Sequence, residues 1–243
     1  MRALSAEDII IVWERGEHRH PVDRALTMLA AAHPRMTAGE LAELSIGERD
    51  ARLLGLREAT FGPTLQSFAE CPACRERLTF TLDTRTIRVP KPDRGDGGME
   101  LVAGDHTLRF RLPNSHDLAA LALCGDPETG HRILVERCLL EATRDGIAIG
   151  GDSLPDETVA KLAGAMAELD PQAEVLIGMD CLSCGHRWQL LFDIAAFLWT
   201  EIALQAKRLL REVHILARAY GWREADILSL SATRREFYID MVI

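Results

Sequence analysis

Two short stretches of the chain carry the same arrangement of cysteines. Cys71 and Cys74 lie in the stretch ECPACRERLTFTLD, and Cys181 and Cys184 lie in the later stretch DCLSCGHRWQLLFD. In both, a Cys-x-x-Cys pair is followed three residues later by a segment with strand-like alternation. Two such pairs can face each other and supply the four sulfur ligands that tetrahedral Zn²⁺ prefers. The four cysteines therefore predict one structural zinc site.

A redox or disulfide role for these cysteines is the main alternative. A thioredoxin-like Cys-x-x-Cys opens a helix, whereas both pairs here continue into strand-like segments. Gly185 occupies a position at which a metal-binding turn favours a left-handed backbone, and Arg75 takes the matching position at a cost of about 1 kcal/mol. His186 is expected outside the ligand set. Cys124 and Cys138 have no Cys-x-x-Cys partner and are expected to be buried core thiols.

A catalytic role finds no support in the sequence. A catalytic zinc ion keeps an open coordination position and usually takes histidine or carboxylate ligands, whereas four thiolates leave no position free. The chain contains no HExxH, no GxSxG, no Walker lysine loop and no dinucleotide-binding glycine pattern. We therefore expect a protein that is not an enzyme.

The elements that position the cysteines alternate between helical and strand-like patterns. The first seventy residues predict three or four short helices. Their starts are indicated by capping or first-turn residues: Ser5 with Asp8, Pro21, and Ser45 with Glu48. Further along, we expect strands at 78–89, 99–112, 173–180 and 187–193, a polar loop at 90–98, and helices at 116–125, 128–146 and 155–170. Gly104-Asp105 predicts the turn of a hairpin.

The last fifty residues return to a helical pattern. Apolar residues recur there at alternating spacings of three and four: Trp199, Ile202, Ala206, Leu209, Val213, Leu216 and Tyr220. Packing within the chain is the favoured interpretation of this row, and a coiled coil with a partner is the alternative. Gly221 fits a helix C-cap, and Thr233 with Glu236 predicts the cap of a last short helix.

The predicted fold class is α+β. Helical N- and C-terminal regions at 1–69 and 194–243 flank a small zinc-ribbon-like antiparallel β module at 70–193, which carries an α/β insertion at 84–179. Because loop-closure entropy grows slowly with length, a long insertion between the two cysteine pairs is compatible with one metal site.

Composition excludes several classes of function. The chain has 243 residues, 47% of them hydrophobic and 27% charged, with a net charge of −9. This charge argues against general attraction to nucleic acids or anionic membranes. The sequence shows neither a signal-peptide pattern nor an apolar run long enough for a membrane helix, so we expect a cytoplasmic protein.

The stretch LSIGERDARLLGLREATFG, followed by CPAC and LTFTLD, resembles the baseplate hub assembly chaperone family of T-even-type contractile-tail phages and phage-like contractile injection systems. The matching residues are Ser45, Ile46, Gly47, Arg49, Asp50, Leu56, Arg57 and Gly62, followed by Cys71 and Cys74. The tail matches a pattern of tail and baseplate proteins at Tyr220, Gly221, Trp222, Glu224, Ile227, Leu228, Leu230, Arg234, Arg235 and Tyr238. These stretches cover less than half of the chain, and the resemblance does not extend to 84–179.

The resemblance implies a non-enzymatic assembly factor or structural component of a baseplate. Its partners would be baseplate or hub proteins, and it would stay in the cytoplasm or enter the phage-like particle. Candidate partner-binding residues are Trp222, Arg234, Arg235 and Tyr238, since Trp, Tyr and Arg often anchor protein interfaces. Asp50 and Arg57 share one side of a predicted helix. They suit an ion pair within the chain or a specificity element at an interface.

A zinc ribbon that binds nucleic acid is the alternative function. The basic residues near the cysteine pairs are few and interspersed with acidic ones: Arg75, Arg77, Lys91 and Arg187. Such a charge balance disfavours contact with a phosphate backbone.

Overall fold

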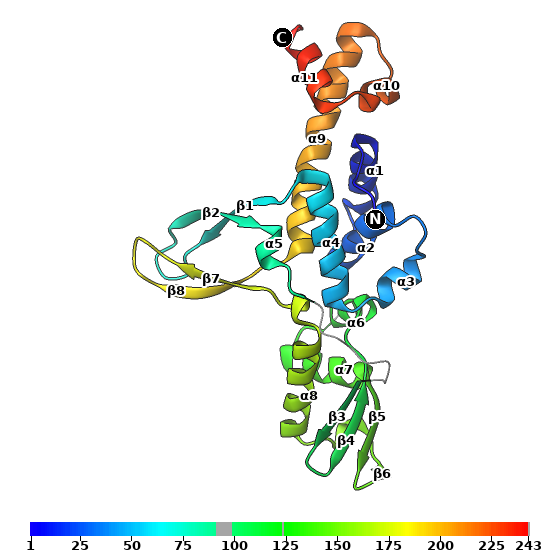
Figure 1. Cartoon of the computed structure of the whole chain (residues 1–243), viewed down its shortest axis with the longest axis vertical. Helices are drawn as coiled ribbons and strands as arrows, with labels where there is room; N and C mark the ends of the chain where they lie inside the picture. The colour runs from blue at the N-terminus through cyan, green and yellow to red at the C-terminus, as the bar shows by residue number, and fades with distance from the viewer. Residues whose placement is uncertain (91–98, 123, 243) are drawn as a thin grey trace. The chain divides into compact units, whose positions relative to one another are not determined.

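A computed structural model describes residues 1–90, 99–122 and 124–242 (Figure 1). The chain forms two compact units. The helical unit comprises Met1–Ala38, Leu53–Thr64 and Asp193–Ile243, and the mixed unit comprises Gly39–Arg52 and Leu65–Phe192. Helical terminal regions and small antiparallel sheets confirm the predicted α+β class. No helix in the described residues is both long and apolar enough to cross a membrane.

The helical unit is built around one long helix, α9. Its helices are α1 (Ala6–Gly16), α2 (Pro21–Ala32), the second half of α4 (Ile46–Phe61), α9 (Ile194–Tyr220), α10 (Glu224–Ser229) and α11 (Ala232–Asp240). The predicted capping box forms at the start of α1, where the Ser5 hydroxyl accepts from the Asp8 N–H. Gly221 ends α9 with a φ of 68°. The predicted cap of α11 is wrong, because Ser231 rather than Thr233 caps that helix.

The apolar row of α9 is buried within the chain. Ile202, Ala206, Leu209, Val213 and Leu216 lie on the buried side, while α1, α2, α10 and α11 all pack against α9. The row is therefore used for packing inside the helical unit.

The mixed unit contains two hairpins that each carry one cysteine pair. These cysteine hairpins are β1 (Thr64–Glu70) with β2 (Arg77–Asp83), and β7 (Leu176–Asp180) with β8 (Arg187–Leu191). Figure 1 shows the two hairpins side by side. The helical expectation for the first seventy residues is wrong for β1. The strand expected at 78–89 is shorter, because α5 (Thr84–Ile87) begins directly after β2.

The insertion between the hairpins is an α/β layer. Its sheet has the order β3 (Met99–Ala103), β4 (His106–Phe110), β5 (Leu139–Arg144) and β6 (Ile147–Ala148). The helices are α6 (Ser115–Leu121), α7 (Pro127–Cys138) and α8 (Asp156–Leu169), and two 3₁₀ turns lie at Gly151–Ser153 and Pro171–Ala173. Ala103 pairs with His106, which confirms the predicted Gly104-Asp105 turn.

The helix expected at 128–146 ends at Cys138, and Leu139–Arg144 is a strand. Pairing of Ala142 with Leu108 buries both residues in the core of the layer, which favours the strand. The polar loop expected at 90–98 lies, from residue 91 onward, outside the described residues. A short α3 (Ala38–Glu43) precedes α4, whose first half, residues 46–52, belongs to the mixed unit.

Candidate metal centre

The turns of the two cysteine hairpins bring the four predicted cysteines together. The Cys71 Sγ lies 3.7 Å from the Cys184 Sγ, and the Cys74 Sγ lies 3.6 Å from the Cys181 Sγ. All four sulfur atoms lie within 4.8 Å of one another. Four sulfurs at about 2.3 Å from one tetrahedral zinc ion would stand about 3.8 Å apart. The sulfur cluster therefore has dimensions that fit Zn²⁺.

The two turns share one backbone geometry. The N–H of Arg75 donates to the Cys71 carbonyl at 2.8 Å, and the N–H of Gly185 donates to the Cys181 carbonyl at 2.8 Å. Both residues are left-handed, with φ of 62° for Arg75 and 74° for Gly185. The left-handed arginine was predicted from the sequence and carries the steric cost that glycine avoids. The repeated sequence unit thus encodes a repeated structural unit.

The cluster is half enclosed. Cys71 and Cys181 are buried, whereas Cys74 and Cys184 are exposed, so the site is open to metal from solvent on one side. None of the six cysteines forms a disulfide bond. In the described residues this cluster is the only group of three or more potential metal-ligating side chains.

The thiols influence one another electrostatically. Backbone N–H groups of Cys184 and Ser183 lower the pKa of Cys181 to about 7. The N–H of Glu76 favours a thiolate at Cys74, but the sulfur of Cys184 and the other two thiols raise the pKa of Cys74 to about 12. Four adjacent thiolates repel one another unless a cation compensates their charge. A bound divalent metal would supply that compensation and release the thiol protons.

The remaining sulfur and histidine predictions concern residues outside this cluster. The exposed His186 ring stacks on Trp188 with centroids 6.0 Å apart. Cys138 is fully buried, as expected, and its burial raises the pKa of the thiol to about 11. Cys124 is half-buried.

Comparison with protein families identifies the chain. The sequence pattern of the T4 bacteriophage base plate protein family matches residues 34–199, which is more than half of the chain. The chain belongs to this family. The match covers both cysteine hairpins and the α/β insertion, so 84–179 lies within the family pattern, and it ends before the C-terminal tail. No curated protein and no solved structure gives a significant match.

Family membership supports a baseplate protein that interacts with other baseplate proteins. It does not distinguish the hub assembly chaperones, to which the sequence motifs were likened, from other baseplate components. A structural family of this kind also suggests a non-enzymatic role.

In this base plate protein, the motif around Ser45 and Gly47 meets a carboxylate from the end of the insertion. Asp170 is buried and accepts hydrogen bonds from the Ser45 hydroxyl at 3.0 Å and from the Gly47 N–H at 2.8 Å. A Cβ on residue 47 would stand 2.4 Å from an oxygen of Asp170, so the glycine is required by close approach. Sequence reasoning missed Asp170, because its partners lie more than 120 residues away in the chain.

Asp50 and Arg57 are both buried, and each forms an ion pair with another residue of its own unit. The Arg57 Nε and Nη2 donate to the Glu201 carboxylate at 2.9 and 2.8 Å. The Arg49 Nε donates to Asp50 at 2.7 Å. The exposed fractions of Asp50 and Arg57 are 8% and 3%. Their polar groups are therefore engaged inside the units in which they lie.

The four partner-binding candidates of the tail divide into exposed and buried residues. Arg235 is only 4% exposed and donates to Glu212 at 2.8 Å. Trp222 and Tyr238 are half-buried and meet edge to face with centroids 5.0 Å apart. Arg234 is exposed. Of these four, Arg235 thus serves chiefly to hold α11 against α9.

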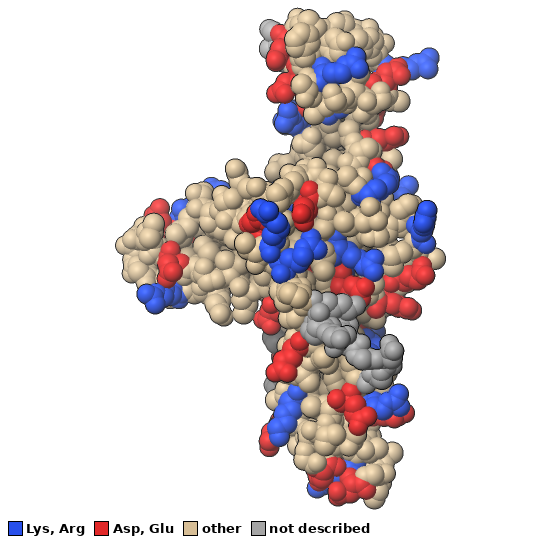
Figure 2. Space-filling view, in the orientation of Figure 1, with Lys and Arg blue, Asp and Glu red and all other residues tan. Residues whose placement is uncertain are grey.

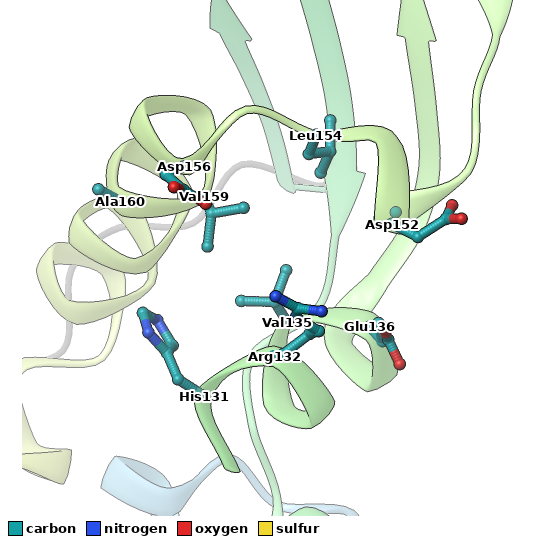
Figure 3. A pocket seen from close by; sticks show the side chains of 10 residues that line it. His131, Arg132, Val135, Glu136, Asp152, Leu154, Asp156, Val159 and Ala160 are labelled. Carbon is teal, nitrogen blue, oxygen red and sulfur yellow. The ribbon is translucent and has the colours of Figure 1, made fainter. Parts of the chain in front are cut away.

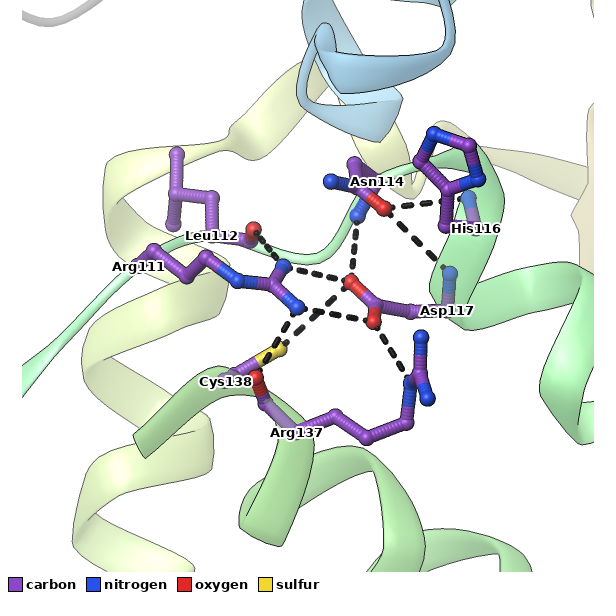
Figure 4. Close-up of polar contacts among 7 residues, drawn as sticks. All are labelled: Arg111, Leu112, Asn114, His116, Asp117, Arg137 and Cys138. Atoms are coloured by element: carbon purple, nitrogen blue, oxygen red, sulfur yellow. Dashed lines mark hydrogen bonds and ion pairs between the residues drawn. The ribbon is translucent and has the colours of Figure 1, made fainter. Parts of the chain in front are cut away.

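A second buried carboxylate that the sequence analysis missed organises the α/β insertion (Figure 4). Asp117 is fully buried and receives the Arg111 guanidinium at 2.6 and 2.9 Å and the Arg137 Nε at 2.8 Å. Its side chain also accepts from the N–H of Asn114, the N-cap of α6. The spacing of Asn114 and Asp117 is a capping box, so this part of the network was visible in the sequence.

Two of the hollows beside α7 in the mixed unit differ in chemical character. One has a volume of about 330 Å³ and mixed charge, and it is lined by His131, Arg132 and Glu136 of α7 together with Asp152 and Asp156. Figure 3 shows side chains of α7 and α8 facing this hollow. The other has a volume of about 410 Å³ and is mainly apolar, with Ile46, Leu118, Leu134, Met166 and Pro171 among its lining residues.

Proposed function

We propose that this chain is a non-enzymatic assembly factor of a contractile-tail baseplate hub, in which one structural Zn²⁺ ion is bound by Cys71, Cys74, Cys181 and Cys184. The sulfur cluster, with dimensions suited to tetrahedral Zn²⁺, is the observation that carries the metal part of this proposal. Membership of the base plate protein family supports the assembly part. The motif resemblance to hub assembly chaperones narrows the role to the hub.

A structural role suits the ion better than a catalytic one. Four thiolates fill the tetrahedral shell and leave no position for water or substrate. Each cysteine hairpin is a separate two-stranded sheet, and isolated two-stranded hairpins are marginally stable in water. An ion held by both turns would join the hairpins and stabilise the ends of the α/β insertion at the same time.

The surface of the cysteine hairpins favours a protein partner over nucleic acid. Figure 2 shows mostly uncharged side chains over these hairpins. Arg77 lies over the Phe68 ring at 4.0 Å, and Arg187 pairs with Asp180 at 3.0 Å. The exposed apolar residues Phe68, Leu176, Leu182 and Leu191 lie in this region. A phosphate-binding ribbon would instead present several uncompensated cations.

The metal part is tested by elemental analysis of the full-length protein. We expect about one zinc ion per chain, and Cys71→Ser or Cys181→Ser should lose most of the zinc together with the order of the cysteine hairpins. Cys124→Ser is the matched control, because its thiol lies outside the cluster and its loss should leave zinc unchanged. Metal-free protein that keeps both hairpins folded would refute the structural zinc ion.

The assembly part is tested in cells that produce the particle. Tagged full-length chain should co-purify identified hub or baseplate subunits, and deletion of its gene should leave sheath and tube without complete baseplates. Comparing mature particles with assembly intermediates then separates a permanent component from a factor that leaves. Normal, infective or injecting particles after deletion would contradict an assembly role.

A further inference from the structure

The outward face of α9 carries a row of basic side chains. Lys207, Arg211, His214 and Arg218 are all exposed, and their spacing of four, three and four places them within about 60° on one side of the helix. This basic stripe lies opposite the buried apolar row. No acidic residue of α9 shares its side of the helix.

Both acidic residues of α9 are engaged elsewhere. Glu201 pairs with the buried Arg57. Glu212 pairs with the buried Arg235 and with Arg208 of its own helix. Among described residues, Lys207, Arg211 and Arg218 form no salt bridge with any carboxylate. The fold therefore directs the negative charges of α9 inward and leaves its basic stripe uncompensated.

We propose that the basic stripe is the docking surface for an acidic face of a hub or baseplate subunit, which names the partner surface of the proposed function and rests on it. From residue 207 to 218 the stripe extends about 17 Å along the helix, enough to meet about three turns of a partner helix or a short row of carboxylates. Such a partner would match the stripe by charge complementarity.

The net charge of −9 limits where an acidic partner can dock on this chain. An acidic subunit is repelled by most of this chain and attracted by the stripe, so the charge pattern selects one orientation of docking. DNA offers one negative charge per about 1.7 Å, and a single short stripe on an acidic protein neutralises few of those charges. A folded acidic protein surface is therefore favoured over nucleic acid.

The test compares two full-length variants with the same change in net charge. Lys207→Glu, Arg211→Glu and Arg218→Glu together reverse the stripe. Arg15→Glu, Arg19→Glu and Arg35→Glu together form the control, because these arginines are also exposed residues of the helical unit. Circular dichroism and zinc content establish that both variants are folded.

Tagged proteins are then used to capture hub and baseplate subunits, identified by mass spectrometry, from cells that lack the native gene. We expect wild type and control to capture the same identified subunits, and the stripe variant to capture at least about tenfold less. Raising ionic strength from about 0.05 to 0.3 M should release the subunits from wild type, because salt screens exposed charges.

The outcomes separate the two proposals. Unchanged capture by the stripe variant overturns the docking surface and leaves the proposed function standing. Failure of wild type to capture any baseplate subunit overturns the proposed function together with this inference. A fluorescent DNA duplex of about 25 base pairs serves as the second probe. Tight DNA binding by wild type that disappears in the stripe variant would assign the stripe to phosphate and overturn an acidic protein partner.

Discussion

The contact between Asp170 and the start of α4 leads to a quantitative prediction. Asp170→Ala removes the acceptor of two hydrogen bonds, one from the Ser45 hydroxyl and one from the Gly47 N–H. Hydrogen bonds to a charged group contribute about 1.5 kcal/mol each. Asp170 is only 6% exposed, so water can hardly replace these bonds. We therefore expect the substitution to lower the local stability of the first turn of α4 by about 3 kcal/mol.

Amide hydrogen exchange at Gly47 measures this effect directly, because that N–H donates to Asp170. A loss of about 3 kcal/mol corresponds to a decrease in protection of about a hundredfold. Asp170→Asn keeps one carbonyl oxygen as an acceptor, so it should lower the protection of the Gly47 amide less than Asp170→Ala does. Glu174→Gln is the control, since Glu174 is exposed in the same segment and its change should alter protection little.

A double-mutant cycle with Gly47 tests the geometry behind this number. The added methyl of Gly47→Ala would meet an Asp170 oxygen at 2.4 Å, and overpacking of this kind costs about 1–3 kcal/mol. With Asp170→Ala already present, that oxygen is gone and the methyl should cost less by about 1 kcal/mol. Additive effects of the two substitutions would refute the close approach on which the reasoning depends.

Two further predictions concern buried charge and backbone strain. Burial opposes ionisation of Asp117, but Arg111 and the other donors hold its pKa at about 2 against an ordinary value of 3.8. The ionised carboxylate thus stabilises the fold by about 2 kcal/mol. This stabilisation is fully present above about pH 4 and is lost as the pH falls through 2. In urea unfolding, the difference in unfolding free energy between wild type and Asp117→Asn should therefore narrow from pH 4 to pH 2. A difference that stays constant from pH 6 to 2 would argue against the ionised pair. Arg75→Gly should raise the free energy of unfolding by about 1 kcal/mol at unchanged zinc content, because glycine adopts the left-handed conformation without strain. Gly185→Ala should lower the free energy of unfolding by a similar amount. Changes of the same sign in the two variants would contradict left-handed strain at these turns.

The sequence predicted the elements whose determinants are local. Cys-x-x-Cys spacing followed by alternation predicted the strands β2 and β8 that leave the two cysteine pairs, and capping residues such as Ser5 and Ser45 placed helix starts correctly. The strand β1 was missed although Gly62-Pro63 ends α4 just before it. The sequence of β1 does not alternate clearly between apolar and polar residues. Leu65 and Ala69 are buried, but the apolar Phe68 lies on the exposed face and is 62% exposed.

Tertiary pairing decided the elements that local pattern could not. No Gly or Pro separates α7 from β5, and the sequence from Arg132 to Arg144 is compatible with a continuous helix. The chain becomes extended at Leu139 because β5 pairs with β4, where Arg109 donates to Glu141 at 2.8 Å across the exposed face. Strand formation here depends on a neighbour that lies about 30 residues away, so propensity alone gives the wrong answer.

The residues that the sequence placed at an interface also depend on distant tertiary partners. Arg57 and Arg235 lie in the two stretches that were likened to baseplate proteins, yet their carboxylate partners, Glu201 and Glu212, lie 144 and 23 residues away and are supplied by α9. An arginine in such a stretch therefore need not mark a partner surface, since a buried ion pair places the same demand on residue type. Partner contacts are better sought among charges that the fold leaves exposed and uncompensated. In the described part of α9 that criterion selects the basic stripe, because the two internal arginines already occupy both of its carboxylates.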